Sequence, residues 1–162
     1  MADDIDNNNC EKSVENEVIE KFLIFTVREK RYALPSKFIN EVAALEKIFP
    51  LPLVPGYVRG IINRYSVPYA LIDISFLLFS ETSNARKVVV LKEEVDKLAL
   101  LIDDVTDIAD LPSGELMKID QEGTAQAGLV SAFFDWKEDS VFCLDTGELI
   151  GRIRQDFERQ ET

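Results

Sequence analysis

The sequence predicts an all-β protein of the barrel type. Short runs rich in β-branched and aromatic residues recur along the chain, and turn-forming residues separate them at close spacing. A clear helical period appears near the C-terminus. A parallel α/β sheet would need helical patterns between its strands, so these observations favour small β-barrels. With 162 residues, 46% of them hydrophobic, the chain can form one globular domain or two small fused ones.

Residues 1–20 form an acidic lead-in. They contain seven acidic residues and a single lysine, so about half of the net charge of -12 lies there. Such a segment buries too little apolar surface to offset the entropy lost on ordering. We therefore expect a disordered tail, and we interpret it as a solubilising segment rather than as an acidic docking arm.

The first barrel is predicted to span residues 21–80. Its opening run, KFLIFTV at residues 21–27, is dense in strand formers, and a charged turn leads into a second strand at residues 32–34. Pro35 ends that strand because it has no amide to donate to a sheet. After it, Ser36 favours the start of a short helix, whose apolar side would be formed by Phe38, Ile39, Val42 and Leu45.

A turn-rich segment and a tight corner complete this block. Three prolines between residues 50 and 55 favour an extended approach to Gly56. The Gly60-x-x-Asn63 corner then leads into an apolar run that ends at Asp73, the pattern of a strand entering and leaving a sharp bend.

The second barrel is predicted to span residues 81–145. Two apolar runs separated by a charged turn indicate a hairpin whose strands are buried on both faces. These runs lie at residues 88–91 and 98–102, weaker strand patterns follow at 115–119 and 129–134, and a clear strand closes the block at 141–144.

A helix is predicted over residues 146–158. Asp145 and Glu148 can form a capping box, and Leu149, Ile153 and Phe157 fall on one helical face. We expect a single domain over residues 21–158, and periodicity leaves open whether the strands interleave between the two barrels.

Charge and hydropathy exclude several partners. A net charge of -12 and a pI of about 4.5 would cause repulsion from nucleic acid and from anionic lipid surfaces. No apolar run approaches the ~20 residues needed to cross a bilayer. We therefore expect a cytoplasmic protein that neither binds nucleic acid nor inserts into a membrane.

The inventory of reactive side chains is short. The chain has no histidine, which excludes His-dependent triads, imidazole metal sites and a phosphoaccepting histidine on this chain. Cys10 and Cys143 form no disulfide framework and no metal-ligand spacing, and Cys143 is expected to be a small buried apolar residue. We expect no cofactor and no metal.

An enzymatic alternative depends on aspartates that follow the second hairpin. Dense carboxylates can hold a hard metal ion or perform acid-base chemistry, but no EF-hand spacing, phosphate-binding loop or nucleophile elbow accompanies them here. In a loop after a strand, such acids are usually turn formers. The candidates are Asp103, Asp104 and Asp107, with Asp73 and Asp110 as further members.

Several short motifs occur in a fixed order along residues 21–150. They are FLIFTV followed by Tyr32-Ala33-Leu34-Pro35, the pair Glu41-Val42, Pro52-x-x-Pro55, Gly60-x-x-Asn63, Leu100-Leu101-Ile102-Asp103 with Val105-Thr106-Asp107-Ile108, and Phe142-Cys143-Leu144-Asp145. Together these motifs resemble those of the CheW family of chemotaxis adaptors.

The resemblance implies a non-enzymatic adaptor made of two five-stranded SH3-like barrels with short helices and a C-terminal helix. Its implied partners are the histidine kinase CheA, the cytoplasmic tips of chemoreceptors and, in rings, other CheW-like proteins. The implied location is the cytoplasm, at membrane-bound receptor arrays. Modest pairwise affinities would suffice, because an array raises the effective concentration of each contact.

The chain departs from the family at its Asn-Leu-Arg-Gly signature. Arg64-Tyr65-Ser66 occupies the Leu-Arg-Gly positions, so Tyr65 stands where the family has its arginine. That arginine is tied to coupling, and Glu41 corresponds to its expected partner. Tyrosine cannot make a charge-assisted, two-pronged bond to a carboxylate. Glu41 can instead reach Arg64, unless the one-residue shift points Arg64 to the opposite face.

The predicted receptor-binding surface has two parts. On general burial tendencies the two aliphatic residues are more often core than binding residues, the glycine is more often needed for a backbone turn, and the asparagine can cap that turn. Tyrosine and arginine are types enriched at binding hot spots. The surface comprises Ile39, Glu41 and Val42 on one part, and Gly60, Asn63, Arg64 and Tyr65 on the facing corner.

A specialised paralogue is the alternative within the same class. Loss of the signature arginine is compatible with a protein that fills array positions without activating the kinase. The kinase-docking residues, the stimulus and the receptors served are not predicted by the sequence.

Overall fold

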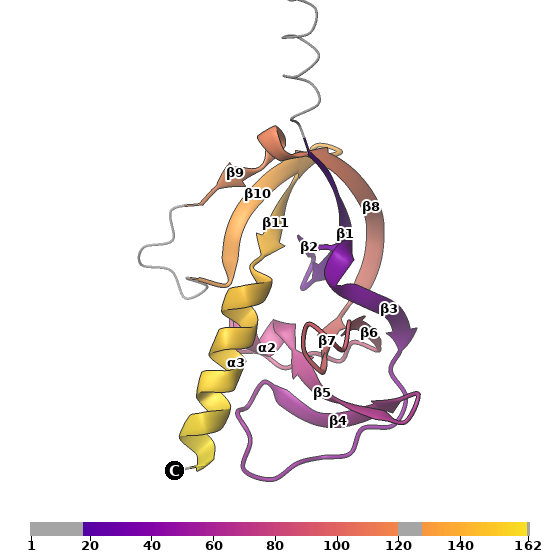
Figure 1. The fold of residues 1–162 in the computed structure, drawn as a ribbon, viewed down its shortest axis with the longest axis vertical. Coiled ribbons are helices and arrows are strands. Elements are labelled where there is room, and N and C mark those ends of the chain that lie inside the picture. The colour runs from indigo at the N-terminus through magenta and orange to yellow at the C-terminus, as the bar shows by residue number, and fades with distance from the viewer. Residues whose placement is uncertain (1–17, 120–127, 162) are drawn as a thin grey trace, which may run out of the picture.

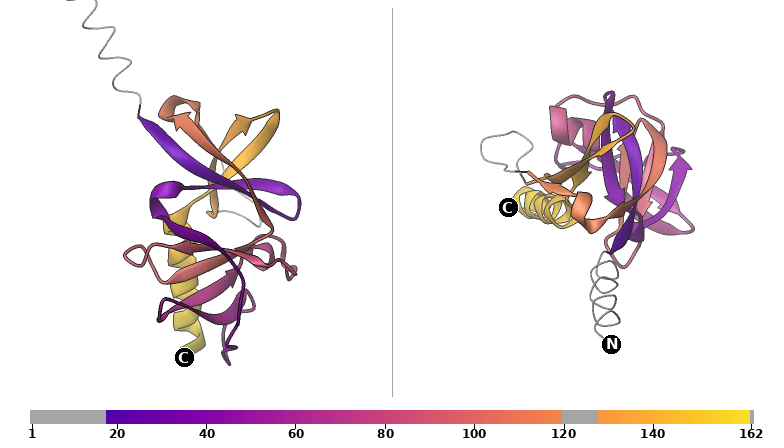
Figure 2. Two further views of the ribbon diagram at one scale, coloured as in Figure 1. Left: turned by 90° about the vertical axis from the view of Figure 1, so that its right-hand side faces the viewer. Right: turned by 90° about the horizontal axis from the view of Figure 1, so that it is seen from above.

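The computed structural model describes residues 18–119 and 128–161, with Gln160 and Glu161 described by backbone only. Two β-sheets lie one above the other, and a long helix runs beside the lower sheet (Figure 1). The turned view on the left of Figure 2 shows the same two layers. Most of the predicted acidic tail and Cys10 lie outside the described residues.

The upper sheet has the strand order β8-β1-β2-β11-β10-β9. Neighbouring strands in this sheet pair antiparallel, except for β2 and β11, which are parallel. The strands are β1 (Ile19–Val27), β2 (Lys30–Pro35), β8 (Asp104–Pro112), β9 (Met117–Lys118), β10 (Val130–Trp136) and β11 (Asp139–Leu144).

The lower sheet has the order β3-β6-β7-β5-β4, again antiparallel apart from one pair, β5–β7. Its strands are β3 (Ile39–Ala44), β4 (Val58–Arg64), β5 (Val67–Asp73), β6 (Lys87–Leu91) and β7 (Leu98–Ile102). The buried hairpin predicted from residues 88–91 and 98–102 is β6–β7, and this prediction is confirmed.

The strands interleave between the sheets. Asp103 alone separates β7 in the lower sheet from β8 in the upper one. A single 3-10 turn, Ser36–Phe38, separates β2 from β3 in the same way. Each of the predicted blocks, residues 21–80 and 81–145, therefore contributes strands to both sheets.

The prediction of a mostly β protein is confirmed, but the prediction of two five-stranded SH3-like barrels is not. Over the described residues, the sheets have six and five strands, and in neither does the hydrogen-bonded order return to its first strand. Register shifts at Ile24/Phe25, Ile39/Glu41 and Val58/Gly60 bend the strands without closing the ladders.

The short helix predicted after Ser36 is wrong. Only Ser36–Phe38 forms a helical turn, and Ile39 begins strand β3. The apolar spacing also fits a strand in which Ile39, Glu41 and Ala43 face inward, because β-branched residues favour strands and β6 offers a ladder of backbone partners. Val42 consequently faces outward, with 41% of its surface exposed.

The largest core cluster joins both sheets to the C-terminal helix. α3 (Thr146–Glu161) buries Leu149 and Ile153 in it, and Asp145 caps the helix by accepting the Glu148 amide at 3.0 Å. The predicted helix is thus confirmed and extends three residues further. A shorter helix, α2 (Ile74–Phe79), follows β5 and packs on the same cluster. Among the described helices, none is long and apolar enough to span a bilayer.

Cys143 lies in a second core cluster within the upper sheet. Burial raises the pKa of its thiol to about 12, so the nucleophilic thiolate is scarce at neutral pH. The expectation of a small buried apolar residue is confirmed.

Candidate functional site: a corner between the two edges of the lower sheet

Glu41 and Arg64 meet although their strands lie at opposite ends of the lower sheet. Arg64 Nε donates to Glu41 Oε1 at 2.8 Å, so the curvature of the sheet brings β3 and β4 together. Both side chains are mostly covered, with 21% and 24% of their surfaces exposed for Arg64 and Glu41. The bond to Glu41 raises the pKa of Arg64, so the guanidinium stays charged.

The side on which Arg64 lies explains how the pair can form. Along β4, Ile62 is buried, Asn63 is exposed and Arg64 is again half-buried, so Arg64 shares the inner side with Ile62. Glu41 lies on the corresponding inner side of β3. Arg64 therefore pairs with the carboxylate that the family arginine was expected to bind.

Tyr65 lies beside this pair in the turn between β4 and β5. Tyr65 and Ser66 both have positive φ, 53° and 65°, and they connect the paired residues Arg64 and Val67. Tyr65 is 79% exposed, and the Arg64 guanidinium carbon lies 5.3 Å from its ring centroid, within cation–π range. The corner thus presents the exposed ring of Tyr65 next to the Arg64 guanidinium, which Glu41 holds in place.

Gly60 has a structural role that the sequence left open. Its φ is +140°, and a Cβ there would lie 2.4 Å from the carbonyl oxygen of Phe49. Phe49 exchanges two backbone hydrogen bonds of 2.8 Å with Ile61. Only glycine permits this close approach, so Gly60 shapes the segment before β4.

The remaining predicted site residues are only partly brought together. Ile39 packs half-buried against the main core, whereas Val42 is on the outer face of β3. Asn63 is exposed and, together with Arg64, lines a cavity of about 250 Å³. The other lining residues are Ala44, Glu46, Lys47, Phe49 and Ile62.

Sequence reasoning missed a second exposed feature, the segment Phe49–Leu53, here called the apolar loop. Phe49 and Leu51 are exposed at its surface, and Leu53 is 84% exposed with a positive φ of 55°. The available signal was the alternation of large apolar residues with prolines, Phe49-Pro50-Leu51-Pro52-Leu53. Proline has no amide to donate to a neighbouring strand, so this alternation argues against a central strand despite its hydrophobicity.

The five candidate aspartates do not form one site. Within the described ranges, no group of three or more His, Cys, Asp and Glu side chains could hold a metal ion. Asp73 is buried, whereas the other four pair separately. Asp103 accepts the Arg28 amide, Asp104 pairs with Lys87, Asp107 with Lys137 at 3.1 Å, and Asp110 with Lys21 at 4.0 Å.

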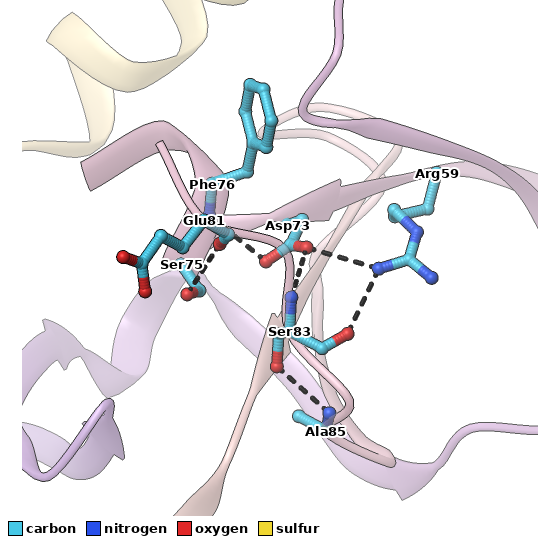
Figure 3. A network of polar contacts seen from close by, with 7 residues as sticks. All are labelled: Arg59, Asp73, Ser75, Phe76, Glu81, Ser83 and Ala85. Carbon is cyan, nitrogen blue, oxygen red and sulfur yellow. Dashed lines mark hydrogen bonds and ion pairs between the residues drawn. The ribbon is translucent and has the colours of Figure 1, made fainter. Parts of the chain in front are cut away.

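Asp73 instead organises the connection that follows α2 (Figure 3). Its carboxylate accepts the Ser83 amide at 2.9 Å and the Phe76 amide at 3.3 Å, and it pairs with Arg59 Nη1 at 3.2 Å. Arg59 Nη1 also donates to the Ser83 carbonyl at 3.1 Å. A buried carboxylate with this many donors is a structural group, and it fixes β4 against residues 80–86.

A solved structure has a similar fold. The crystal structure of the scaffolding protein TtCheW from Thermoanaerobacter tengcongensis matches with a TM-score of 0.72 and 17% identity, over 79% of this chain and 90% of that one. The model of the CheW-like domain matches residues 21–154. The chain therefore belongs to the CheW-like domain family. A search of curated proteins found no match.

Proposed function

We propose that this chain is a chemotaxis adaptor that couples chemoreceptors to the histidine kinase CheA, without enzymatic activity of its own. Family membership supports this assignment. The observation that carries it is the Glu41–Arg64 pair, which persists although Tyr65 occupies the position of the family arginine. The chain works in the cytoplasm at membrane-bound arrays, and residues 21–158 act as one domain whose two sheets correspond to the family's two SH3-like barrels.

The receptor-binding surface in this proposal is the corner and the adjoining face of β3. Tyr65 and Val42 supply exposed apolar surface, and Arg64 and Asn63 supply polar groups beside it. Such a mixture of an aromatic anchor with a polar surround is typical of binding hot spots. Ile39 and Gly60 contribute indirectly, through packing and through the shape of the segment before β4.

The kinase-docking surface in this proposal is the apolar loop. An adaptor needs surface for each of its partners, and a standard contact covers about 800 Å² per partner. In Figure 1 the segment between β3 and β4 runs beneath β4 toward α3. Leu51 and Leu53, in this segment, offer exposed apolar surface.

Co-sedimentation with receptor-containing membranes, with and without CheA, tests the proposal. We expect this chain to pellet with receptor membranes and to increase the amount of CheA that pellets with them. A chain that ignores both receptors and CheA would contradict the assignment, because both predicted contacts would be missing.

A second candidate is a paralogue that occupies array positions, including rings with other CheW-like proteins, without activating the kinase. The observation that favours it is the exposed Tyr65, which cannot replace a guanidinium in contacts to a partner. Kinase activity in the same reconstituted mixture separates the candidates. The paralogue would recruit CheA without raising its activity.

A further inference from the structure

The apolar loop is fastened at its start. Phe49 exchanges two backbone hydrogen bonds with Ile61 of β4, and Gly60 provides the space for the Phe49 carbonyl. The beginning of the loop is therefore part of the sheet edge, and its position is fixed by backbone bonds.

Gly56 and Tyr57, which follow the loop, are also held in place, and one of the hydrogen bonds that hold Tyr57 is made with the C-terminal helix. The Tyr57 hydroxyl donates to Asp156 Oδ2 of α3 at 2.5 Å, and the Tyr57 carbonyl accepts the Asp73 amide at 2.7 Å. Tyr57 is 6% exposed. The Phe76 ring lies directly on Gly56, where a Cβ would come within 2.8 Å of it.

Asp156 itself is held in place by the docking of α3. Leu149 and Ile153 are buried in the main core, and Arg154 pairs with Asp96 at 3.3 Å. Burial and the bond to Asp156 both raise the pKa of Tyr57, so its hydroxyl remains a donor at physiological pH. The helix is thus a rigid support for the chain just after the loop.

Between these two fastenings, Leu53 has a strained backbone. A leucine with positive φ and an almost fully exposed side chain gains nothing locally from that conformation. Such strain persists only where the surrounding structure determines it, and it concentrates at functional segments.

We propose that Tyr57 and Asp156 are positioning residues, through which the C-terminal helix holds the apolar loop in the conformation that docks the kinase. This inference rests on the proposed function of the loop. It assigns α3 the role of holding the loop in position, without a contact of its own with the kinase.

The test is a double-mutant cycle on the affinity for the regulatory domain of CheA, measured by calorimetry on the full chain at a temperature where all variants are folded. We expect Tyr57→Phe and Asp156→Ala each to weaken binding about threefold to tenfold, the worth of one hydrogen bond. Asp156→Asn should retain affinity, because its amide oxygen still accepts the bond. In a Leu53→Ser background, Tyr57→Phe should cost nothing further.

The matched control is Tyr32→Phe, which removes the hydroxyl of another buried tyrosine that lies in the upper sheet. It should leave kinase affinity unchanged. If Leu53→Ser weakens binding while Tyr57→Phe and Asp156→Ala do not, the positioning role is overturned and the docking surface stands. If Leu53→Ser has no effect, the loop is not the docking surface and both are overturned.

Discussion

The two hairpins of the lower sheet differ in what they contribute. In β6–β7, every residue except Lys87 is buried. In β4–β5, several positions are only half-buried, Asn63 and Pro68 are exposed, and the hairpin ends in a strained turn that carries Tyr65. The central hairpin therefore contributes more buried apolar surface to stability, whereas the edge hairpin is less well packed and exposes side chains that a partner could contact.

The largest effect should come from the central hairpin. Leu100→Ala removes a fully buried side chain of β7 and should lower the free energy of unfolding by about 2–5 kcal/mol. Val42→Ala, on the outer face of β3, should cost less than about 1 kcal/mol. Urea denaturation measures both, and equal losses would contradict the division between centre and edge.

Breaking the corner pair should have an intermediate effect. Glu41→Gln or Arg64→Gln should each cost about 1 kcal/mol, since the pair is mostly covered yet reached by solvent. Coupling in a reconstituted mixture of receptor and kinase should fall more sharply, and the exchange Glu41→Arg with Arg64→Glu should restore part of it.

The control for the corner pair is Glu93→Gln, which removes an exposed pair with Lys97. It should change neither stability nor coupling. Full coupling by both corner variants would show that the pair is only structural.

A turn away from the corner should give a smaller, stabilising effect. Lys137 and Glu138 connect β10 to β11 with positive φ values of 49° and 70°, a conformation that asparagine and glycine adopt more easily. Replacing them by Asn-Gly should raise stability by roughly 0.5–1 kcal/mol and leave coupling unchanged. Thermal unfolding checks the gain, and a loss would mean that the lysine's pair with Asp107 outweighs the backbone strain.

The smallest effect on stability should come from Tyr65→Arg. Because Tyr65 is exposed in a turn, we expect this substitution to change the free energy of unfolding of the protein by less than about 0.5 kcal/mol. Kinase output should nevertheless change, since a second guanidinium would lie beside that of Arg64, in place of an exposed aromatic ring. A destabilised variant with unaltered output would identify Tyr65 as a packing residue.

Local patterns predicted those elements in which length, composition and capping agree with the period. The run Val88–Leu91 is short and rich in β-branched residues, which favours a buried strand, and the spacing of Leu149 and Ile153 follows a capping box, which favours a helix. At Phe38–Leu45 the same apolar positions fit both a helix and a strand, and pairing with β6 decided between them. The interleaving of the sheets depends on contacts distant in sequence, which no local pattern contains.

The candidate site was predictable in its composition but not in its geometry. Glu41, Arg64 and Tyr65 were identified, yet the bend was expected at Gly60-x-x-Asn63, whereas β4 continues to Arg64 and the chain turns at Tyr65 and Ser66. Gly60 was identified without its reason, because the carbonyl that approaches it belongs to Phe49, which is eleven residues away.

The single residue between β7 and β8 has a mechanical consequence. With so short a passage, and with only one 3-10 turn between β2 and β3, neither layer can swing on a flexible tether. A displacement of one sheet by a partner should therefore move the other sheet with it, because these short connections leave no slack between them. The same threading means that neither layer could be cut out, exchanged or duplicated by recombination as a contiguous piece of the gene.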